Sequence, residues 1–276
     1  MSHPDALPGV VDVLPPGWKP ATTPIVDRLY SLVVGDGAPR GQTRRYTLLY
    51  EGTVRLARTL DYDEVVEALE RDLSLYVAEH ARELLFVHAG VVGWQGRAIV
   101  LPGPSYTGKS TLVAALLRAG VTYYSDEFAV FDRRGRVHPF PRPLSLRAQP
   151  GGRPKRYAID ALKGGAGTKP LLVALVAMTQ YRDGARFRPR PLSGGEAVLA
   201  LLANTVSARR QPDVAFRTLQ QVVSGAQAVK GSRGEADDTV DALLRVACEV
   251  GGSAADPPRG ELERTAATLT KSYPVP

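Results

Sequence analysis

The fold of this chain is decided by the stretch Gly103-Pro104-Ser105-Tyr106-Thr107-Gly108-Lys109-Ser110-Thr111. It fits the pattern G-x-x-x-x-G-K-[ST] of a phosphate-binding loop. The two glycines permit the backbone dihedrals and close approaches that such a loop needs. Its N–H groups and the positive end of the following helix converge on a polyphosphate. We expect Lys109 to reach the outer phosphates and the Ser110 hydroxyl to complete the shell of a Mg²⁺ ion.

The residues on either side of the loop agree with this interpretation. An apolar run from Arg97 to Pro102 is typical of a short buried strand, and apolar residues recur at helical spacing between Leu112 and Leu117. Gly120 is placed to end that helix. Strand, loop and helix therefore come in the order that a nucleotide site requires. We predict that ATP is held by Gly103, Ser105, Tyr106, Thr107, Gly108, Lys109, Ser110 and Thr111.

A second strand-like run, Val121 to Phe128, carries two adjacent carboxylates, Asp126 and Glu127. In phosphoryl transfer, one carboxylate can hold Mg²⁺ while the other orients or deprotonates the attacking hydroxyl. The charge of the metal counters the repulsion between the two anions. A solvent-exposed turn is the alternative, and the apolar residues on both sides make it less favourable. We expect Asp126 to bind the metal together with Ser110, and Glu127 to act on the acceptor.

His88 lies inside a dense apolar run from Leu84 to Trp94, which predicts a buried strand. A histidine in such a strand is commonly a core residue with satisfied hydrogen bonds. Its position upstream of the loop could also bring it alongside the phosphates on a neighbouring strand. The residues alone leave both roles open.

Composition and charge set limits on the class of protein. The chain has 276 residues, 44% hydrophobic and 23% charged, which is ordinary for a globular protein. It shows no apolar run as long as a membrane span and no signal-peptide core, so we expect a cytoplasmic protein without a membrane partner. The net charge of +7 comes from arginines spread along the chain, so no nucleic acid partner is expected. Cys248, the single cysteine, excludes an internal disulfide and is expected in the core.

The first 83 residues predict a small layer without obvious chemistry. Residues 1–25 are rich in proline and are expected to form an extended arm. The runs 45–50 and 53–60, joined by Glu51-Gly52, are typical of a hairpin. Asp61 and Glu64 form a capping-box pattern that opens a helix ending near His80. We interpret residues 26–83 as a small α+β layer packed on the core.

The chain after the acid pair predicts further strands and helices around a basic segment. Residues 128–131 and 137–140 are typical of a hairpin, 171–178 of a central strand and 186–189 of an edge strand. A capping box formed by Ser193 and Glu196, and a proline at 212, mark the starts of two helices. A strand near 227–230 and a helix over 235–250 follow. The glycine-rich segment 142–169 could clamp phosphates, close over the site, dock a substrate or simply be solvated, and its basic residues are Arg142, Arg147, Arg153, Lys155, Arg156, Lys163 and Lys169.

Three of these motifs together resemble a known family. The stretch Val87-His88-Ala89-Gly90-Val91, the loop and Ser125-Asp126-Glu127 resemble the catalytic domain of HPr kinase/phosphorylase, and most of all its shorter HPr kinase-like relatives. The match covers about residues 85–150, with a weaker echo at 169–178. The resemblance implies a mixed, β-rich α/β fold with a P-loop core of the HPr kinase and phosphoenolpyruvate carboxykinase type, in place of a doubly wound sheet. We assign residues 84–250 to this core and 251–276 to a C-terminal tail.

The resemblance also implies an activity. Members transfer the γ-phosphoryl group of ATP, with Mg²⁺, to a serine hydroxyl. By position, Lys109 and Ser110 would bind phosphates and metal, Asp126 would hold the metal, and His88 falls on an active-site histidine. Glu127 falls where the family usually has a second aspartate acting as base.

The acceptor is left open by the sequence. The segments by which the family docks the HPr protein have no counterpart here, so a peptide, another protein or a small-molecule hydroxyl are all candidate substrates. The alternatives to a serine kinase are a small-molecule kinase on the same core and a non-catalytic module that responds to nucleotide. A homo-oligomer is compatible with the sequence.

Overall fold

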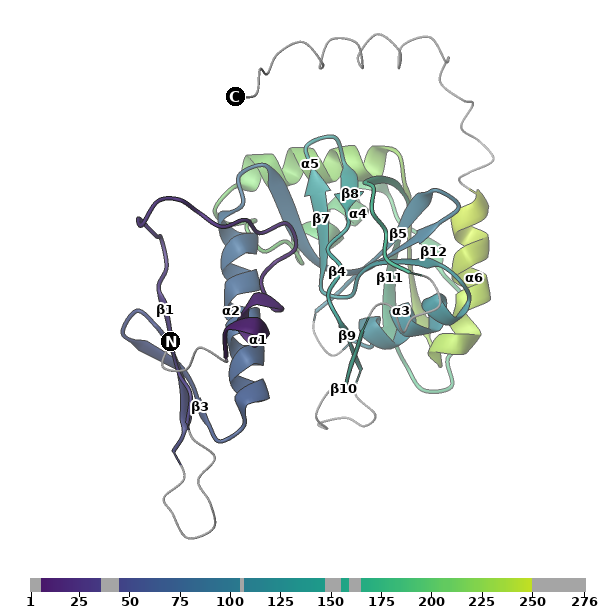
Figure 1. Ribbon diagram of the computed structural model, residues 1–276. Coiled ribbons are helices and arrows are strands. Elements are labelled where there is room, and N and C mark those ends of the chain that lie inside the picture. Colours follow the sequence, from purple (N-terminus) through teal and green to yellow (C-terminus); the bar gives the residue numbers. More distant parts are fainter. Residues whose placement is uncertain (1–5, 36–44, 105–106, 147–154, 159–164, 250–276) are drawn as a thin grey trace.

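The protein is a mixed α/β structure built around one large sheet (Figure 1). The computed structural model describes residues 6–35, 45–104, 107–146, 155–158 and 165–249. Within those ranges there are six helices. The N-terminal layer comprises α1 (Leu7–Val11), β1 (Tyr30–Val33), β2 (Thr47–Glu51), β3 (Val54–Thr59) and α2 (Tyr62–His80).

The rest of the described chain forms the large sheet, a two-stranded ribbon and four helices. Its elements are β4 (Leu84–Trp94), β5 (Arg97–Pro102), α3 (Lys109–Arg118), β6 (Thr122–Ser125), β7 (Phe128–Asp132), β8 (Arg136–His138), β9 (Leu144–Leu146), β10 (Lys155–Tyr157), β11 (Leu171–Tyr181), β12 (Arg190–Pro191), α4 (Gly194–Leu202), α5 (Pro212–Ser224), β13 (Gln227–Arg233) and α6 (Ala236–Glu249).

The large sheet mixes parallel and antiparallel pairs. Its strand order is β12-β13-β11-β5-β4-β7-β8, and β6 pairs with β4 beside this path. Strand β11 runs parallel to both β5 and β13, whereas β4 runs antiparallel to β5. The start of β11 also pairs with β8, which closes part of the sheet on itself. The expected mixed, β-rich α/β class is therefore confirmed.

Strand β5 is apolar after its first residue, Arg97, because helices cover both faces of the sheet. Ala98 and Val100 belong to the core shared with α4 and α5, while Ile99 and Leu101 belong to the core shared with α3 and α6. Successive side chains of a strand point to opposite faces, so a strand buried on both faces loses the alternation of apolar and polar residues. The phosphate-loop motif thus begins at the end of a fully buried strand.

The N-terminal layer has its own small core and joins the large sheet at the far end of α2. Leu32, Leu49, Val65 and Leu69 pack its three-stranded sheet against α2. A second cluster packs Ala78 of α2 with three phenylalanines from later in the chain, which are Phe86, Phe128 and Phe140. Their rings meet edge to face, with centroids 5.7–5.9 Å apart. Edge-to-face pairs add to the stabilisation that comes from burial alone.

The predicted local elements are confirmed along most of the chain, with three differences. Residues 7–11, expected in an extended arm, form α1, since Pro8 stands in the first turn where no N–H is needed. The predicted edge strand 186–189 is shifted to β12, because ladder pairing with β13 begins only after Pro189, at Arg190. Part of segment 142–169, expected as a loop, forms the antiparallel pair β9 and β10.

The proposed division into arm, layer, core and tail stays a prediction. Residues 1–5 of the arm, and all of the tail beyond residue 249, lie outside the described residues. Within the described ranges, every helix is too short or too polar to cross a bilayer.

The turn between β7 and β8 depends on the carboxylate of Asp132. It accepts hydrogen bonds from the backbone of Arg134 and Arg136 (2.9 and 3.0 Å), from the Arg136 guanidinium (2.8 Å) and from His138 (3.1 Å). Partial burial raises its pKa, but His138 and Arg136 outweigh that effect, and the net pKa lies below the ordinary value of 3.8.

Replacing this carboxylate should therefore destabilise the fold in a pH-dependent way. We expect Asp132→Asn to lose about 1–3 kcal/mol of unfolding free energy at pH 7. Because the folded pKa is depressed, the advantage of the wild type is complete above pH 3.8 and is lost as the pH falls through the folded value. Urea unfolding at several pH values measures the difference in unfolding free energy between the wild type and Asp132→Asn. If that difference is the same at pH 2 as at pH 7, this account is contradicted.

Candidate functional site

The phosphate-loop motif is held at both of its glycines. The N–H of Gly103, directly after β5, donates to the carbonyl of His88 on β4 (3.2 Å). Gly108 caps α3 with φ of 80°, in the left-handed region that residues with a Cβ rarely adopt. A Cβ at Gly108 would also lie 2.5 Å from a guanidinium nitrogen of Arg233. The second glycine of the motif is therefore required for its dihedral and for its surroundings.

The ammonium group of Lys109 hydrogen-bonds to the backbone of the loop itself. Its Nζ donates to the carbonyl of Pro104 (2.5 Å), which also accepts from the Thr107 hydroxyl (2.9 Å). Burial lowers the pKa of Lys109, and the charge of Asp126 acts in the opposite direction. Thr111 is exposed on the first turn of α3. The other two predicted loop contacts, Ser105 and Tyr106, lie outside the described residues.

The two carboxylates stand at a bend between β6 and β7. The Ser125 hydroxyl at the end of β6 accepts from the N–H groups of Glu127 (3.2 Å) and Phe128 (3.0 Å), which turns the chain there. The Ser110 hydroxyl on α3 lies close enough to the carboxylate of Asp126 to lower its pKa. The structure therefore brings the start of the helix after the loop against the acid pair.

The environment of the acid pair disfavours ionisation of both groups. Burial raises the pKa of Asp126, opposed by the hydrogen bond from the Tyr123 hydroxyl (2.9 Å) and by the nearby Ser110 hydroxyl. Burial also raises the pKa of Glu127 to about 7, with Arg142 acting against it and Asp126 in the same direction. A carboxylate that titrates near neutral pH can both accept and release a proton, which suits a general base.

His88 is packed in the core and also faces this site. Its ring lies against Phe128, with centroids 4.8 Å apart, and the backbone of Glu127 lies close enough to raise its pKa. Burial and the charge of Lys109 lower its pKa, so the imidazole is neutral at pH 7. His88 can therefore be both a core residue and a site residue, because one face of its ring packs against Phe128 while the imidazole remains beside Lys109.

The groups present fit a magnesium ion that is shared with a nucleotide. Ser110 and Asp126 supply two oxygen ligands next to the loop. Among the residues that the structure describes, no group of three or more His, Cys, Asp or Glu side chains could hold a metal. Mg²⁺ is usually held by one or two carboxylates together with waters and substrate phosphates, so a cage made by the protein alone is unnecessary.

The N-terminal layer reaches this site, which the sequence did not indicate. Arg142, only 6% exposed, donates to Ser74 on α2 (2.6 Å), to the carbonyl of Val13 (3.3 Å) and to the carboxylate of Glu70. Arg156 donates to the same carboxylate (2.7 Å). The carbonyl of Arg142 in turn lies 2.9 Å from the Tyr123 hydroxyl that contacts Asp126. One arginine therefore connects α2 to Asp126 through Tyr123, and its charge also acts on Glu127.

The importance of this connection can be measured as stability. We expect Glu70→Gln to lower the unfolding free energy by about 3–5 kcal/mol, because it leaves the buried Arg142 without its carboxylate. The matched control is Glu83→Gln, which breaks an ion pair with Arg133 (3.3 Å) between largely exposed side chains. That control should lose at most about 1 kcal/mol. Equal losses in denaturant unfolding would show that the buried pair has no special weight.

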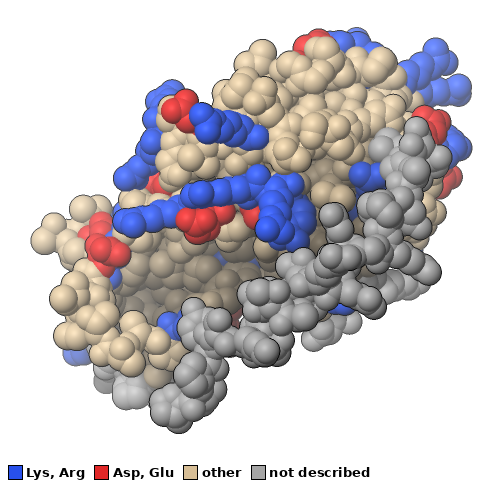
Figure 2. Space-filling view, turned by 90° about the horizontal axis from the view of Figure 1, so that it is seen from above, with Lys and Arg blue, Asp and Glu red and all other residues tan. Residues whose placement is uncertain are grey.

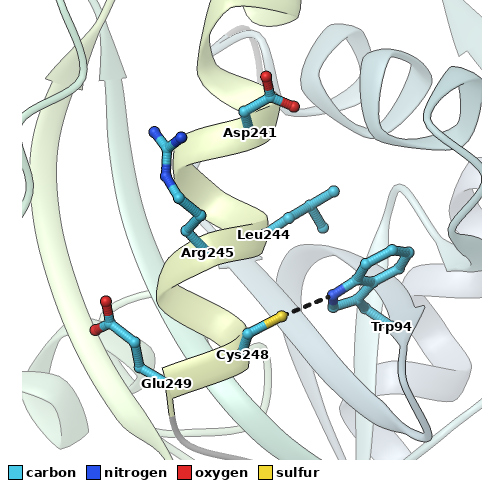
Figure 3. A pocket seen from close by; sticks show the side chains of 6 residues that line it. All are labelled: Trp94, Asp241, Leu244, Arg245, Cys248 and Glu249. Atoms are coloured by element: carbon cyan, nitrogen blue, oxygen red, sulfur yellow. Dashed lines mark hydrogen bonds between the residues drawn. The ribbon is translucent and has the colours of Figure 1, made fainter.

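A separate pocket of about 470 Å³ lies beside the last turns of α6 (Figure 3). Its lining comprises Trp94, Asp241, Leu244, Arg245, Cys248 and Glu249. Cys248, expected in the core, is exposed here, since the buried face of α6 passes through Leu243 and Ala247 instead. Its sulfur accepts from the Trp94 indole N–H (3.4 Å). Trp94 is the last residue of β4 and pairs with the first of β5, so this pocket stands at the opposite end of β5 from the loop.

The charged side chains of one face of the molecule are mixed in sign (Figure 2). Lysine and arginine side chains form several groups there, with acidic side chains between them. Ion pairs such as Arg133 with Glu83 and Arg136 with Asp132 are examples of this mixing in the structure.

Comparisons with known proteins add no assignment. Neither the models of protein families nor the curated proteins gave a match to this chain.

Proposed function

We propose that this protein is an ATP- and Mg²⁺-dependent kinase of the HPr kinase-like type, with a P-loop core, that transfers the γ-phosphoryl group to a hydroxyl. Serine of a peptide or protein is the favoured acceptor, and the cytoplasm, where ATP is available, is the proposed location. The observation that carries this proposal is the approach of the Ser110 hydroxyl to the Asp126 carboxylate, close enough to lower the pKa of that carboxyl. It joins a phosphate-loop motif to an acid pair, which are the two parts that phosphoryl transfer requires.

The roles of the residues follow from their positions. Backbone N–H groups of the loop and the Lys109 ammonium bind the phosphate tail of ATP. Ser110 and Asp126 would hold Mg²⁺, which when bound neutralises charge on the phosphate oxygens. Glu127 accepts the proton of the acceptor hydroxyl while the oxygen of that hydroxyl bonds to the γ-phosphorus. The bond from that phosphorus to the bridging oxygen breaks, and ADP leaves with the electron pair.

Neutral His88 and buried Arg142 complete the surroundings of the base. A neutral imidazole beside Lys109 can accept or donate a hydrogen bond without adding charge to the site. The charge of Arg142 lowers the pKa of Glu127 and so favours its ionised form. Helix α2, which holds Arg142 through Glu70, therefore supports the acceptor side of the proposed site.

The base role of Glu127 gives a direct test. We expect Glu127→Gln to bind Mg-ATP as the wild type does, while transfer of radiolabelled γ-phosphate to a mixture of serine-containing peptides falls about 10²–10⁴-fold. The amide keeps the size and polarity of the side chain but cannot take the proton. Glu83→Gln, an exposed change of the same kind, should keep full transfer.

Each other outcome has a defined meaning. Undiminished transfer by Glu127→Gln removes that residue from the base role. Transfer to small hydroxyl compounds but not to peptides would make the protein a small-molecule kinase. Binding of Mg-ATP without transfer to any acceptor would make it a nucleotide-responsive module.

A further inference from the structure

The side chain of Arg233 is buried behind the phosphate-loop motif. Arg233 is the last residue of β13, and β13, β11 and β5 run parallel, so their carboxyl ends lie at one edge of the sheet. Its side chain is 2% exposed and returns toward the loop. One terminal nitrogen donates to the carbonyl of Gly108 (2.9 Å), and the other to the carbonyl of Gly234 (2.9 Å).

The guanidinium carbon of Arg233 lies 5.7 Å from the centroid of the Tyr181 ring, and Glu235 is the acid whose charge acts on it. In the part of the chain that the structure describes, its guanidinium donates to two backbone carbonyls and to no carboxylate, and its buried Nε has no hydrogen-bond partner. Glu235 is exposed and accepts from the Tyr181 hydroxyl (3.0 Å) instead. An arginine cannot lose its proton in a protein, so the buried charge persists. A buried charge without a partner is strongly unfavourable unless something else compensates for it.

The loop lies directly against this charge. Gly108, whose carbonyl accepts from Arg233, is the residue before Lys109 and caps the helix whose N-terminus would face the phosphates. That carbonyl also accepts from the N–H of Leu112 (3.1 Å), so α3 does not need Arg233 to satisfy its first turn. The hydrogen bond from the guanidinium is therefore not required by α3. What the guanidinium contributes behind the loop is its positive charge.

We propose that Arg233 is a second cation of the nucleotide site, placed behind the loop, whose missing counter-charge is the polyphosphate bound in front of it. The inference rests on the proposed nucleotide site. Arg233 is a positioning residue, because it acts through Gly108 and across the loop without touching the phosphates. Lys109 supplies positive charge from inside the loop, and Arg233 supplies it from outside.

This role predicts opposite effects on stability and on binding. Arg233→Met replaces the buried charge with an apolar side chain of similar length, so the nucleotide-free protein should melt at the same temperature as the wild type or higher. Its affinity for Mg-ATP should fall by about 10- to 100-fold, because a unit charge near the phosphates is lost from a poorly solvated position. Arg233→Lys keeps the charge, so its affinity for Mg-ATP should lie between those of the wild type and Arg233→Met.

A matched control is provided by Arg97, the first residue of β5. Its Nε is also buried without a partner, and its guanidinium also donates to a backbone carbonyl, that of Gly225 (3.2 Å). It lies at the opposite end of β5 from the loop. Arg97→Met should therefore leave the affinity for Mg-ATP unchanged.

Calorimetric titration of the full chain with Mg-ATP, together with melting curves without nucleotide, tests the inference. Weaker binding by Arg233→Met with an unchanged or raised melting temperature supports it. Equal binding by the wild type and Arg233→Met overturns it and leaves the proposed function standing. Weaker binding accompanied by a lower melting temperature, or Arg233→Lys as weak as Arg233→Met, would assign Arg233 a structural role instead. A wild type that does not bind Mg-ATP removes the proposed function, and the inference with it.

Discussion

The arrangement of this site depends on the approach of the Ser110 hydroxyl to the Asp126 carboxylate. Ser110 stands on the first turn of α3, and Asp126 at the bend after β6, so two segments that the large sheet positions separately meet there. Strand β4 carries His88 between them, since it pairs with β5 on one side and with β6 and β7 on the other. Loop, acid pair and histidine are therefore positioned by a single strand and its neighbours.

Burial gives this arrangement its chemical character. The same low-polarity surroundings raise the pKa of Glu127 to about 7 and lower those of Lys109 and His88. Two buried arginines near this arrangement are held differently. Arg142 is paired with Glu70 of α2, whereas Arg233 donates to two backbone carbonyls and to no carboxylate among the described residues. The N-terminal layer thus contributes to the site through one ion pair and not merely through apolar packing.

The sequence predicts those parts of the structure that depend on neighbouring residues. The continuous apolar run of β5, the glycine of the loop and the capping serine of α4 each act over a few positions, and each was found where expected. Contacts between distant segments could not be predicted in this way. Arg142 appeared only as one of several basic residues in a glycine-rich stretch, since nothing local marks it as the partner of Glu70.

Arg233 gave an even weaker signal, because a lone arginine at the end of a strand is commonly solvated. Only the parallel pairing of β13 with β11 brings it to the edge of the sheet where the loop lies. The exposure of Cys248 could not be predicted from local sequence either, since packing against the rest of the fold decides which face of α6 is buried. Side chains that meet across the fold therefore require the topology, which local patterns do not contain.

The central claim is that a nucleotide triphosphate binds at the start of α3 with a divalent ion shared between Ser110 and Asp126. Calorimetric titration with ATP, in the presence and absence of Mg²⁺, on the wild type and on Asp126→Asn tests it most directly. We predict that the wild type binds Mg-ATP with a dissociation constant between about 1 μM and 1 mM, the usual range for enzyme substrates. We also predict that Mg²⁺ strengthens binding to the wild type but much less to the variant. No binding by the wild type, or the same dependence on Mg²⁺ in both proteins, would contradict the claim.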